Sequence, residues 1–133
     1  MNPTLSNAAQ LIGRILLGYI FFRTSIANFG DHDRFVASIA KNGFPLPEIT
    51  YWVAEATMFF GAICTVLGFK ARIAAFLLAV YCIWTAVQVH YVPGDGGQMT
   101  NFVKNLAMAG GHLQLLAVGA GAWSLDAMMG KRR

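Results

Sequence analysis

Charged residues are scarce in this chain of 133 residues and make up only 12% of it. That share is about half of what a soluble domain carries. The hydrophobic fraction is 56% and the mean hydropathy is +0.53. A chain this short has too little interior to bury so much apolar surface. The scarcity of charge therefore excludes an ordinary soluble domain and favours one domain dissolved in a lipid bilayer.

Cysteine is equally scarce, and the two cysteines, Cys64 and Cys82, form no C-x-x-C motif. No Cys/His spacing indicates a zinc site. On the helices predicted below, the two thiols differ in depth by about 9 Å at ~1.5 Å of rise per residue. A disulfide tolerates a Cα separation of only about 7 Å. We therefore expect two buried free thiols.

The net charge of +4 is not gathered into a basic stripe with interleaved aromatic residues, so nucleic acid is not an expected partner. The basic residues are expected to orient the chain and to contact anionic lipid head groups. The N-terminus has no basic segment followed by a small-residue cleavage site. We therefore expect the first apolar segment to be retained as a span.

Four long apolar segments cover residues 8–29, 50–69, 73–91 and 102–123. Each is close to the ~20 residues that cross a bilayer core as a helix. Backbone polar groups must be satisfied internally in lipid, which makes these segments helices. The sequence predicts an all-α polytopic membrane protein: residues 1–133 form one domain of four transmembrane helices in an antiparallel bundle.

The connections between the spans differ in character. Residues 30–49 are polar, and Asp33–Lys41 within them is expected to form a short amphipathic helix at the membrane surface. Residues 68–72 form a tight turn, which makes the second and third spans an antiparallel hairpin. Residues 92–100 form a glycine-rich loop.

Basic residues set the predicted orientation. An even number of spans places five of them on one side: Lys70, Arg72, Lys131, Arg132 and Arg133. The opposite side holds Arg34 and Lys41, with Lys104 at its boundary, together with four acidic residues. We therefore expect both termini in the cytoplasm.

Polar residues within the spans are candidates for a site, because an ionisable group in hydrocarbon costs about 2.5–3.5 kcal/mol or more. Most of them converge on the outer half of the bundle. We predict that eight of them form a polar pocket: Arg14, Asn28, Glu55, Gln88, His90, Lys104, Asn105 and His112.

One face of the first span is expected to turn inward, because it carries polar and small residues at helical spacing. These residues are Arg14, Gly18, Phe21, Ser25 and Asn28. Arg23 points to the opposite face and is expected to extend toward the outer head groups.

The third and fourth spans carry polar faces of their own. Tyr81 and Gln88 share a face of the third span, and Asn105, Met108 and His112 share a face of the fourth. We expect both faces to turn toward the interior of the bundle.

Glu55 is the strongest single candidate. An isolated carboxylate would be very costly in lipid, so Glu55 must be either neutral or paired with a cation. Lys104 has the best matching depth, and Arg14 could reach Glu55 only if helix tilt closed a large gap. A purely structural role, in which Glu55 fixes the register of the helices, is the alternative.

The histidines are open to a similar choice. A metal or haem would need ligands at matched depth, and His90, His112 and Glu55 scatter by more than one helical turn. Hydrogen-bonding roles are therefore expected, and no metal site is predicted.

Several short motifs run through the chain. Residues 101–107 read NFVKNLA, and GG follows at 110–111, GAG at 119–121 and SLD at 124–126. Earlier in the chain stand the pairs Arg14 and Gly18, Pro45 and Pro47 ahead of Glu55, and the segment GFKARIAA at 68–75.

These motifs together resemble the DoxX family of small bacterial and archaeal membrane proteins over nearly the whole chain. The resemblance implies a four-helix bundle in the bacterial cytoplasmic membrane. One departure is Asn28, where many members carry Lys or Gln, so a charge-dependent role at that position would be weakened here.

The resemblance also implies a link to redox systems. The family name comes from a subunit associated with thiosulfate:quinone oxidoreductase and quinol oxidase complexes, other members are linked to oxidative and thiol stress, and distant relatives act in membrane-protein assembly. No catalytic motif and no bound cofactor are indicated. A diffusing quinone is the candidate electron carrier.

Three functions therefore stay open. In a membrane subunit of a redox system, Glu55 and Lys104 would poise charge or protons, while Gln88, Asn105 and His112 would hydrogen-bond a carbonyl. A scaffold or assembly factor would use the same groups for packing and for contact with redox-complex subunits or with further copies of the chain. A small transporter is the third alternative, although no inverted repeat is evident.

Overall fold

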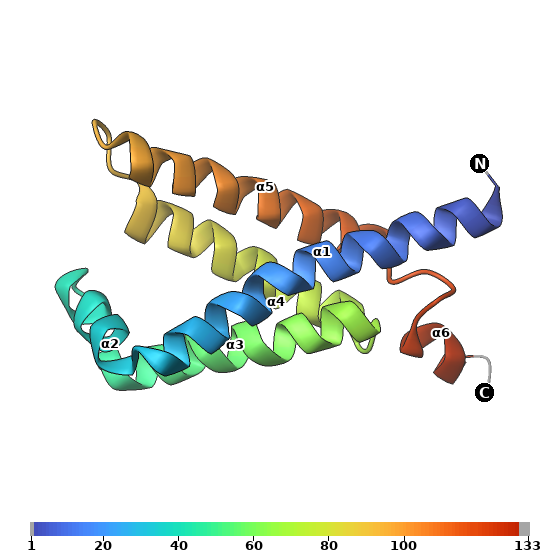
Figure 1. The fold of residues 1–133 in the computed structure, drawn as a ribbon, viewed down its shortest axis with the longest axis horizontal. Helices are drawn as coiled ribbons and strands as arrows, with labels where there is room; N and C mark the ends of the chain where they lie inside the picture. Colours follow the sequence, from blue (N-terminus) through green and yellow to red (C-terminus); the bar gives the residue numbers. More distant parts are fainter. Residues whose placement is uncertain (1, 131–133) are drawn as a thin grey trace.

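A computed structural model describes residues 2–130, and these residues form helices joined by short connections, with no strand among them (Figure 1). The elements are α1 (Pro3–Gly30), α2 (His32–Lys41), α3 (Pro47–Leu67), α4 (Ala71–Thr85), the π-helical turn η1 (Ala86–His90), α5 (Gly96–Val118) and α6 (Leu125–Gly130). The predicted basic residues Lys131, Arg132 and Arg133 lie outside the described residues.

The long helices form two packed pairs. α1 packs along α3, α4 packs along α5, and the α3–α4 hairpin joins the pairs. The N-terminus, the α3–α4 turn and α6 lie at one end of the bundle, which we call the terminal end (Figure 1). The opposite end, called the loop end, holds α2 and the connection between η1 and α5.

Three of the described helices are long and apolar enough to cross a membrane: α1, α3 and the continuous stretch Ala71–His90. The bundle is also apolar on its outside. Leu16, Val53 and Phe60 are each more than 60% exposed. Such a surface is suited to lipid, since a soluble monomer seldom exposes contiguous apolar patches of this extent.

α5 is as long as a span, with 23 residues, but falls short of the hydropathy of the other three. It begins at Gly96, because the Asp95 side chain caps it by accepting a hydrogen bond from the Gln98 N–H at 3.0 Å. It ends at Val118. The predicted helix over 102–123 is therefore wrong at both ends.

Two glycines explain the early end of α5. Gly119 and Gly121 have φ values of +81° and +78°, a backbone region that disfavours other residues and interrupts the helix. Residues 119–124 instead fold back over the α3–α4 turn, and Trp123 lies in this connection rather than at a helix end.

The inward face predicted for α1 is confirmed. Its five buried residues are Arg14, Gly18, Phe21, Ser25 and Asn28, and Arg23 is exposed on the other side. A Cβ at Gly18 would lie 3.0 Å from the Ala62 carbonyl oxygen, so glycine allows α1 and α3 to approach closely here.

The face predicted for the third span is wrong at its end. Ala86 is buried while Gln88 is exposed. The cause is η1, because a π-helical turn holds more residues than an α-helical turn and rotates the residues that follow. The amphipathic helix predicted at 33–41 and the tight turn predicted at 68–72 are both present, as α2 and the α3–α4 turn.

Candidate functional site

The eight polar residues predicted to share a pocket are divided among separate places in the bundle. Glu55 and Asn28 lie together near the loop end, and Arg14 lies at the terminal end. Asn105 and His112 bond to backbone on α5, His90 bonds to Gln98 across the connection between η1 and α5, and Gln88 and Lys104 face outward. Two buried polar clusters, one toward each end, therefore replace the single predicted pocket.

The Glu55 cluster consists of Ser25, Asn28, Tyr51 and Glu55. The Ser25 hydroxyl donates to Glu55 Oε2 at 2.7 Å, and Asn28 Nδ2 donates to Oε1. The Tyr51 hydroxyl donates to the Asn28 carbonyl oxygen at 3.3 Å. Glu55 is only 1% exposed, so both carboxylate oxygens are satisfied by protein groups away from solvent.

The sequence places this cluster through two simple spacings. Ser25 and Asn28 are three residues apart on α1, and Tyr51 and Glu55 are four apart on α3, so each pair shares one face of its helix. Packing α1 along α3 brings the two faces together.

A cationic partner was one of the two alternatives for Glu55, and neither candidate cation pairs with it. Lys104 is exposed on α5, and Arg14 bonds to backbone at the terminal end. Among residues 2–130, no lysine or arginine lies within ion-pair distance of Glu55. Neutral hydrogen-bond donors on α1 take the place of a cation.

A second layer covers this cluster at the loop end. His32 Nε2 lies 2.9 Å from Glu48 Oε1, and His32 Nδ1 lies 2.9 Å from Asp33 Oδ1. The Trp52 indole N–H donates to the same Glu48 oxygen at 3.0 Å, and the His32 ring packs edge-on to Tyr51 at 4.6 Å. The hydrogen bonds to Asp33 and then to Glu48 raise the pKa of His32 above its ordinary value.

The polar cluster at the terminal end is built on Arg14, which is 2% exposed. Its guanidinium donates to the Val66 carbonyl oxygen at 2.9 Å and to the Trp123 carbonyl oxygen. Val66 lies in the last turn of α3, where carbonyl groups have no partner within the helix. A cation there also complements the negative end of the helix dipole.

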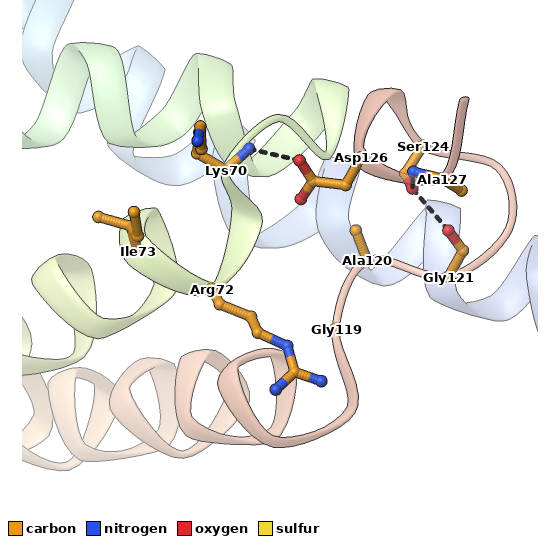
Figure 2. A pocket seen from close by; sticks show the side chains of 9 residues that line it. All are labelled: Lys70, Arg72, Ile73, Gly119, Ala120, Gly121, Ser124, Asp126 and Ala127. Carbon is orange, nitrogen blue, oxygen red and sulfur yellow. Dashed lines mark hydrogen bonds between the residues drawn. The ribbon is translucent and has the colours of Figure 1, made fainter. Parts of the chain in front are cut away.

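Asp126 caps the start of α4, whereas Arg14 caps the end of α3. Its carboxylate oxygens accept from the backbone N–H of Lys70 at 2.8 Å and of Ala71 at 2.9 Å, where α4 begins (Figure 2). Its own N–H donates to the Gly68 carbonyl oxygen at 2.9 Å. A Cβ at Gly68 would overlap Arg14 Nη1, so this turn requires glycine. Both sides of the α3–α4 turn are therefore capped by charged side chains from distant parts of the chain.

The other predicted residues do not join either cluster. His90 Nδ1 lies 2.7 Å from Gln98 Oε1, and the Asn105 side chain donates to the Asn101 carbonyl oxygen at 3.0 Å. Gln88 is exposed. No group of three or more His, Cys, Asp or Glu side chains within residues 2–130 is placed to hold a metal ion.

His112 is the one fully buried histidine of the described chain. Its Nδ1 lies 2.9 Å from the Met108 carbonyl oxygen, and its ring packs edge-on to Phe21 at 5.3 Å. Its Nε2 has no partner among the described groups. Asn105, Met108 and His112 do share an inward face, as predicted.

Two cavities have features relevant to function. One of about 490 Å³ lies between α3 and α4, and its largely apolar lining includes Thr50, Tyr81 and Trp84. Another, of about 390 Å³, lies at the terminal end between the α3–α4 turn and the connection after α5 (Figure 2). Glu55 lines neither of them.

Comparison with known proteins decides the family. The sequence model of the DoxX family matches residues 9–91, which include both Arg14 and Glu55. This chain belongs to the DoxX family. The NFVKNLA stretch at 101–107, which also carries the resemblance, lies beyond the residues that the family model matches.

Two curated relatives of this DoxX protein are inner membrane proteins of Escherichia coli (strain K12). Inner membrane protein YphA is 37% identical over 87% of this chain and 86% of its own length. Inner membrane protein YqjF is 28% identical over 96% of this chain and 97% of its own length. No solved structure matches. Together with the three apolar spans, these relatives identify the chain as a multi-pass inner membrane protein.

Both cysteines are free thiols, as predicted, but only Cys82 is fully buried, and Cys64 is half-buried.

Proposed function

We propose that this DoxX protein is a non-catalytic accessory or assembly component of the inner membrane. The proposal rests on how Glu55 is held, because Glu55 is the strongest candidate for a catalytic residue. Both of its oxygens are bonded to α1, its side chain is 1% exposed, and it lines neither of the cavities described above. A catalytic or proton-carrying carboxylate would need access to a substrate or to water.

The same proposal includes four spans with both termini in the cytoplasm. At ~1.5 Å per residue, α5 is about 35 Å long, enough to cross a hydrocarbon core. It lies along α4 for most of its length. Lys70 and Arg72 at the terminal end favour a cytoplasmic location for that end.

The proposed partners are subunits of a membrane complex or further copies of this chain, and α5 is the surface that we assign to them. Its exposed side carries Lys104 and Gln114. Polar side chains on the outer face of a span are poorly satisfied by lipid and well satisfied by a neighbouring helix.

The proposal is tested by complementation of a strain that lacks the gene. Glu55→Gln removes the carboxylate, but its amide oxygen accepts from Asn28 and its amide N–H₂ donates to Ser25, so the cluster persists. We expect Glu55→Gln to correct any defect of the deletion strain as well as the wild-type chain does at equal membrane abundance. Failure of Glu55→Gln under those conditions would contradict a non-catalytic role.

A second candidate is a quinone-linked redox subunit, and the cavity of about 490 Å³ between α3 and α4 favours it. Tyr81 offers a phenol to a quinone carbonyl, and Trp84 offers an aromatic face for stacking. A quinone in lipid would reach this cavity from the side, since Val53 and Trp84 at its edge are exposed.

Quinone retention separates the two candidates. Purified protein would be placed in nanodiscs that contain ubiquinone. The quinone that they retain would be compared with the amount in nanodiscs of the same lipid and quinone content but without protein. A redox subunit retains quinone in a saturable manner and loses it in Trp84→Ala, whereas an accessory protein retains no more than the lipid does.

A further inference from the structure

The cavity of about 390 Å³ at the terminal end carries a charge pattern that neither function above uses. It lies where three segments meet: the α3–α4 turn, the connection after α5, and the start of α6 (Figure 2). Two cationic side chains, Lys70 and Arg72, and one carboxylate, Asp126, are among its lining residues.

The carboxylate is already engaged. Both oxygens of Asp126 accept backbone N–H groups at the start of α4, where the helix dipole also supplies positive potential. No acidic side chain within residues 2–130 pairs with Lys70 or Arg72. The cavity is therefore positive overall, with the cationic groups of Lys70 and Arg72 unpaired by any described carboxylate.

The Arg72 side chain lies against the backbone of Gly119. A Cβ built on Gly119 would lie 3.5 Å from Arg72 Nε and 3.6 Å from Nη2, so the guanidinium extends along a glycine that offers no side chain (Figure 2). The Ser124 hydroxyl has no proton to offer a ligand, because it donates to the Gly121 carbonyl oxygen at 2.6 Å.

The position of the cavity decides which ligands can reach it. Lys70 and Ala71 stand at the start of a stretch apolar enough to span the membrane, Ala71–His90. The cavity thus lies at the depth of the lipid head groups. Basic pockets at that depth, between helix ends, bind the phosphates of anionic lipids.

We propose that this cavity binds the phosphate group of an anionic phospholipid, with Arg72 as a planar donor and Lys70 as a second positive charge. This site requires only that the α3–α4 turn lies at a membrane surface, so it holds for either function proposed above. Inorganic phosphate shares the chemistry and is the alternative source of the ligand.

Native mass spectrometry of the full chain tests the site. Protein solubilised in mild detergent would be titrated with phosphatidylglycerol, with phosphatidylcholine, and separately with inorganic phosphate. We expect phosphatidylglycerol to be retained and phosphatidylcholine not. Arg72→Gln should weaken retention about fivefold, the effect of one cation near a membrane surface. Arg72→Lys keeps the positive charge, and with it the topology signal. Its retention of phosphatidylglycerol should lie between that of the wild type and that of Arg72→Gln.

Arg34→Gln is the matched control, since it removes the same charge from an exposed arginine on α2, far from the cavity. Unchanged phosphatidylglycerol retention in Arg72→Gln, or an equal loss in Arg34→Gln, would overturn the proposal. Inorganic phosphate binding that is lost in Arg72→Gln would support the site and assign the free ion as its ligand. A variant enters the comparison only if it elutes as the wild type does and has the same helical content.

Discussion

Glu55 and Arg14 are both almost fully buried, and each is held by groups that carry no net charge. Glu55 accepts from a hydroxyl and an amide, and Arg14 donates to carbonyl oxygens at the end of α3. Burying an ionisable group costs free energy unless its hydrogen bonds are replaced. Both oxygens of Glu55 and both terminal nitrogens of Arg14 have such partners, while Arg14 Nε has none, and each residue ties α1 to α3.

Glu55→Ala should lower the free energy of unfolding in detergent by about 1–3 kcal/mol, because it leaves Ser25 and Asn28 without their acceptor. Glu55→Gln keeps an acceptor and a donor in the same place and should remain close to the wild type. Unfolding monitored by circular dichroism compares the two variants. Equal losses of stability in both would mean that the cluster requires the carboxyl group itself, and not merely an acceptor at this position.

For α1 the sequence predicted which side chains are buried, whereas Gln88 and Lys104, predicted to line a pocket, are exposed. The inward face of α1 followed from the helical spacing of polar and small residues between Arg14 and Asn28. Asn28 was predicted to share a pocket with Glu55, but the contact between them was not, because the candidate partners were cations and both Ser25 and Asn28 are neutral. Asp126 was missed as a cap of α4, since it stands 55 residues away from Ala71 and no local motif connects them.

Among the elements, α2 is the least firmly attached, since none of its residues is fully buried. His32 connects it to the start of α3 through Glu48. Hydrogen bonds to Asp33 on α2 itself and then to Glu48 on α3 raise the pKa of His32, so its protonated form stabilises the contact with Glu48 as well as the one with Asp33. That stabilisation is complete below the ordinary His pKa of 6.5 and is lost as the pH rises through the higher folded value.

We therefore expect α2 to be held more firmly in acid than in base. Hydrogen-exchange rates of the α2 amides would be measured at pH 5.5 and at pH 8 in the wild type and in His32→Gln. The ratio of the two rates at each pH cancels the intrinsic pH dependence of exchange. Protection conferred by His32 should fall as the pH rises. A ratio that is the same at both pH values would show that the proton on His32 does not hold α2.

The elements themselves could be predicted from hydropathy, and their ends only in part. The hydrophobic runs located four long helices, and the polar segment at 33–41 located α2. The end of α5 could not be found this way, because Ala120, Ala122 and Trp123 continue the apolar run beyond the helix. Gly119 and Gly121 end the helix with positive φ angles, a backbone feature that hydropathy does not report.

Across the whole molecule, two polar clusters join the segments of the apolar bundle, one near each end. Near the loop end, Glu55 joins α1 to α3 beneath the layer formed by His32 and Glu48. At the terminal end, Arg14 and Asp126 join the α3–α4 turn to the segment after α5. If α5 crosses the membrane, both ends of the described chain lie on one side of it. The proposed location of that end in the cytoplasm then follows from its basic residues.

Cysteine labelling in intact cells tests this topology most directly. Ser38→Cys, Asp95→Cys and Met129→Cys would each be exposed to a membrane-impermeant maleimide, with the wild-type chain as the control for Cys64 and Cys82. We predict labelling at positions 38 and 95 from outside, and labelling at position 129 only after the membrane is permeabilised. Labelling of positions 95 and 129 from the same side would contradict a fourth span and the four-helix membrane bundle with it.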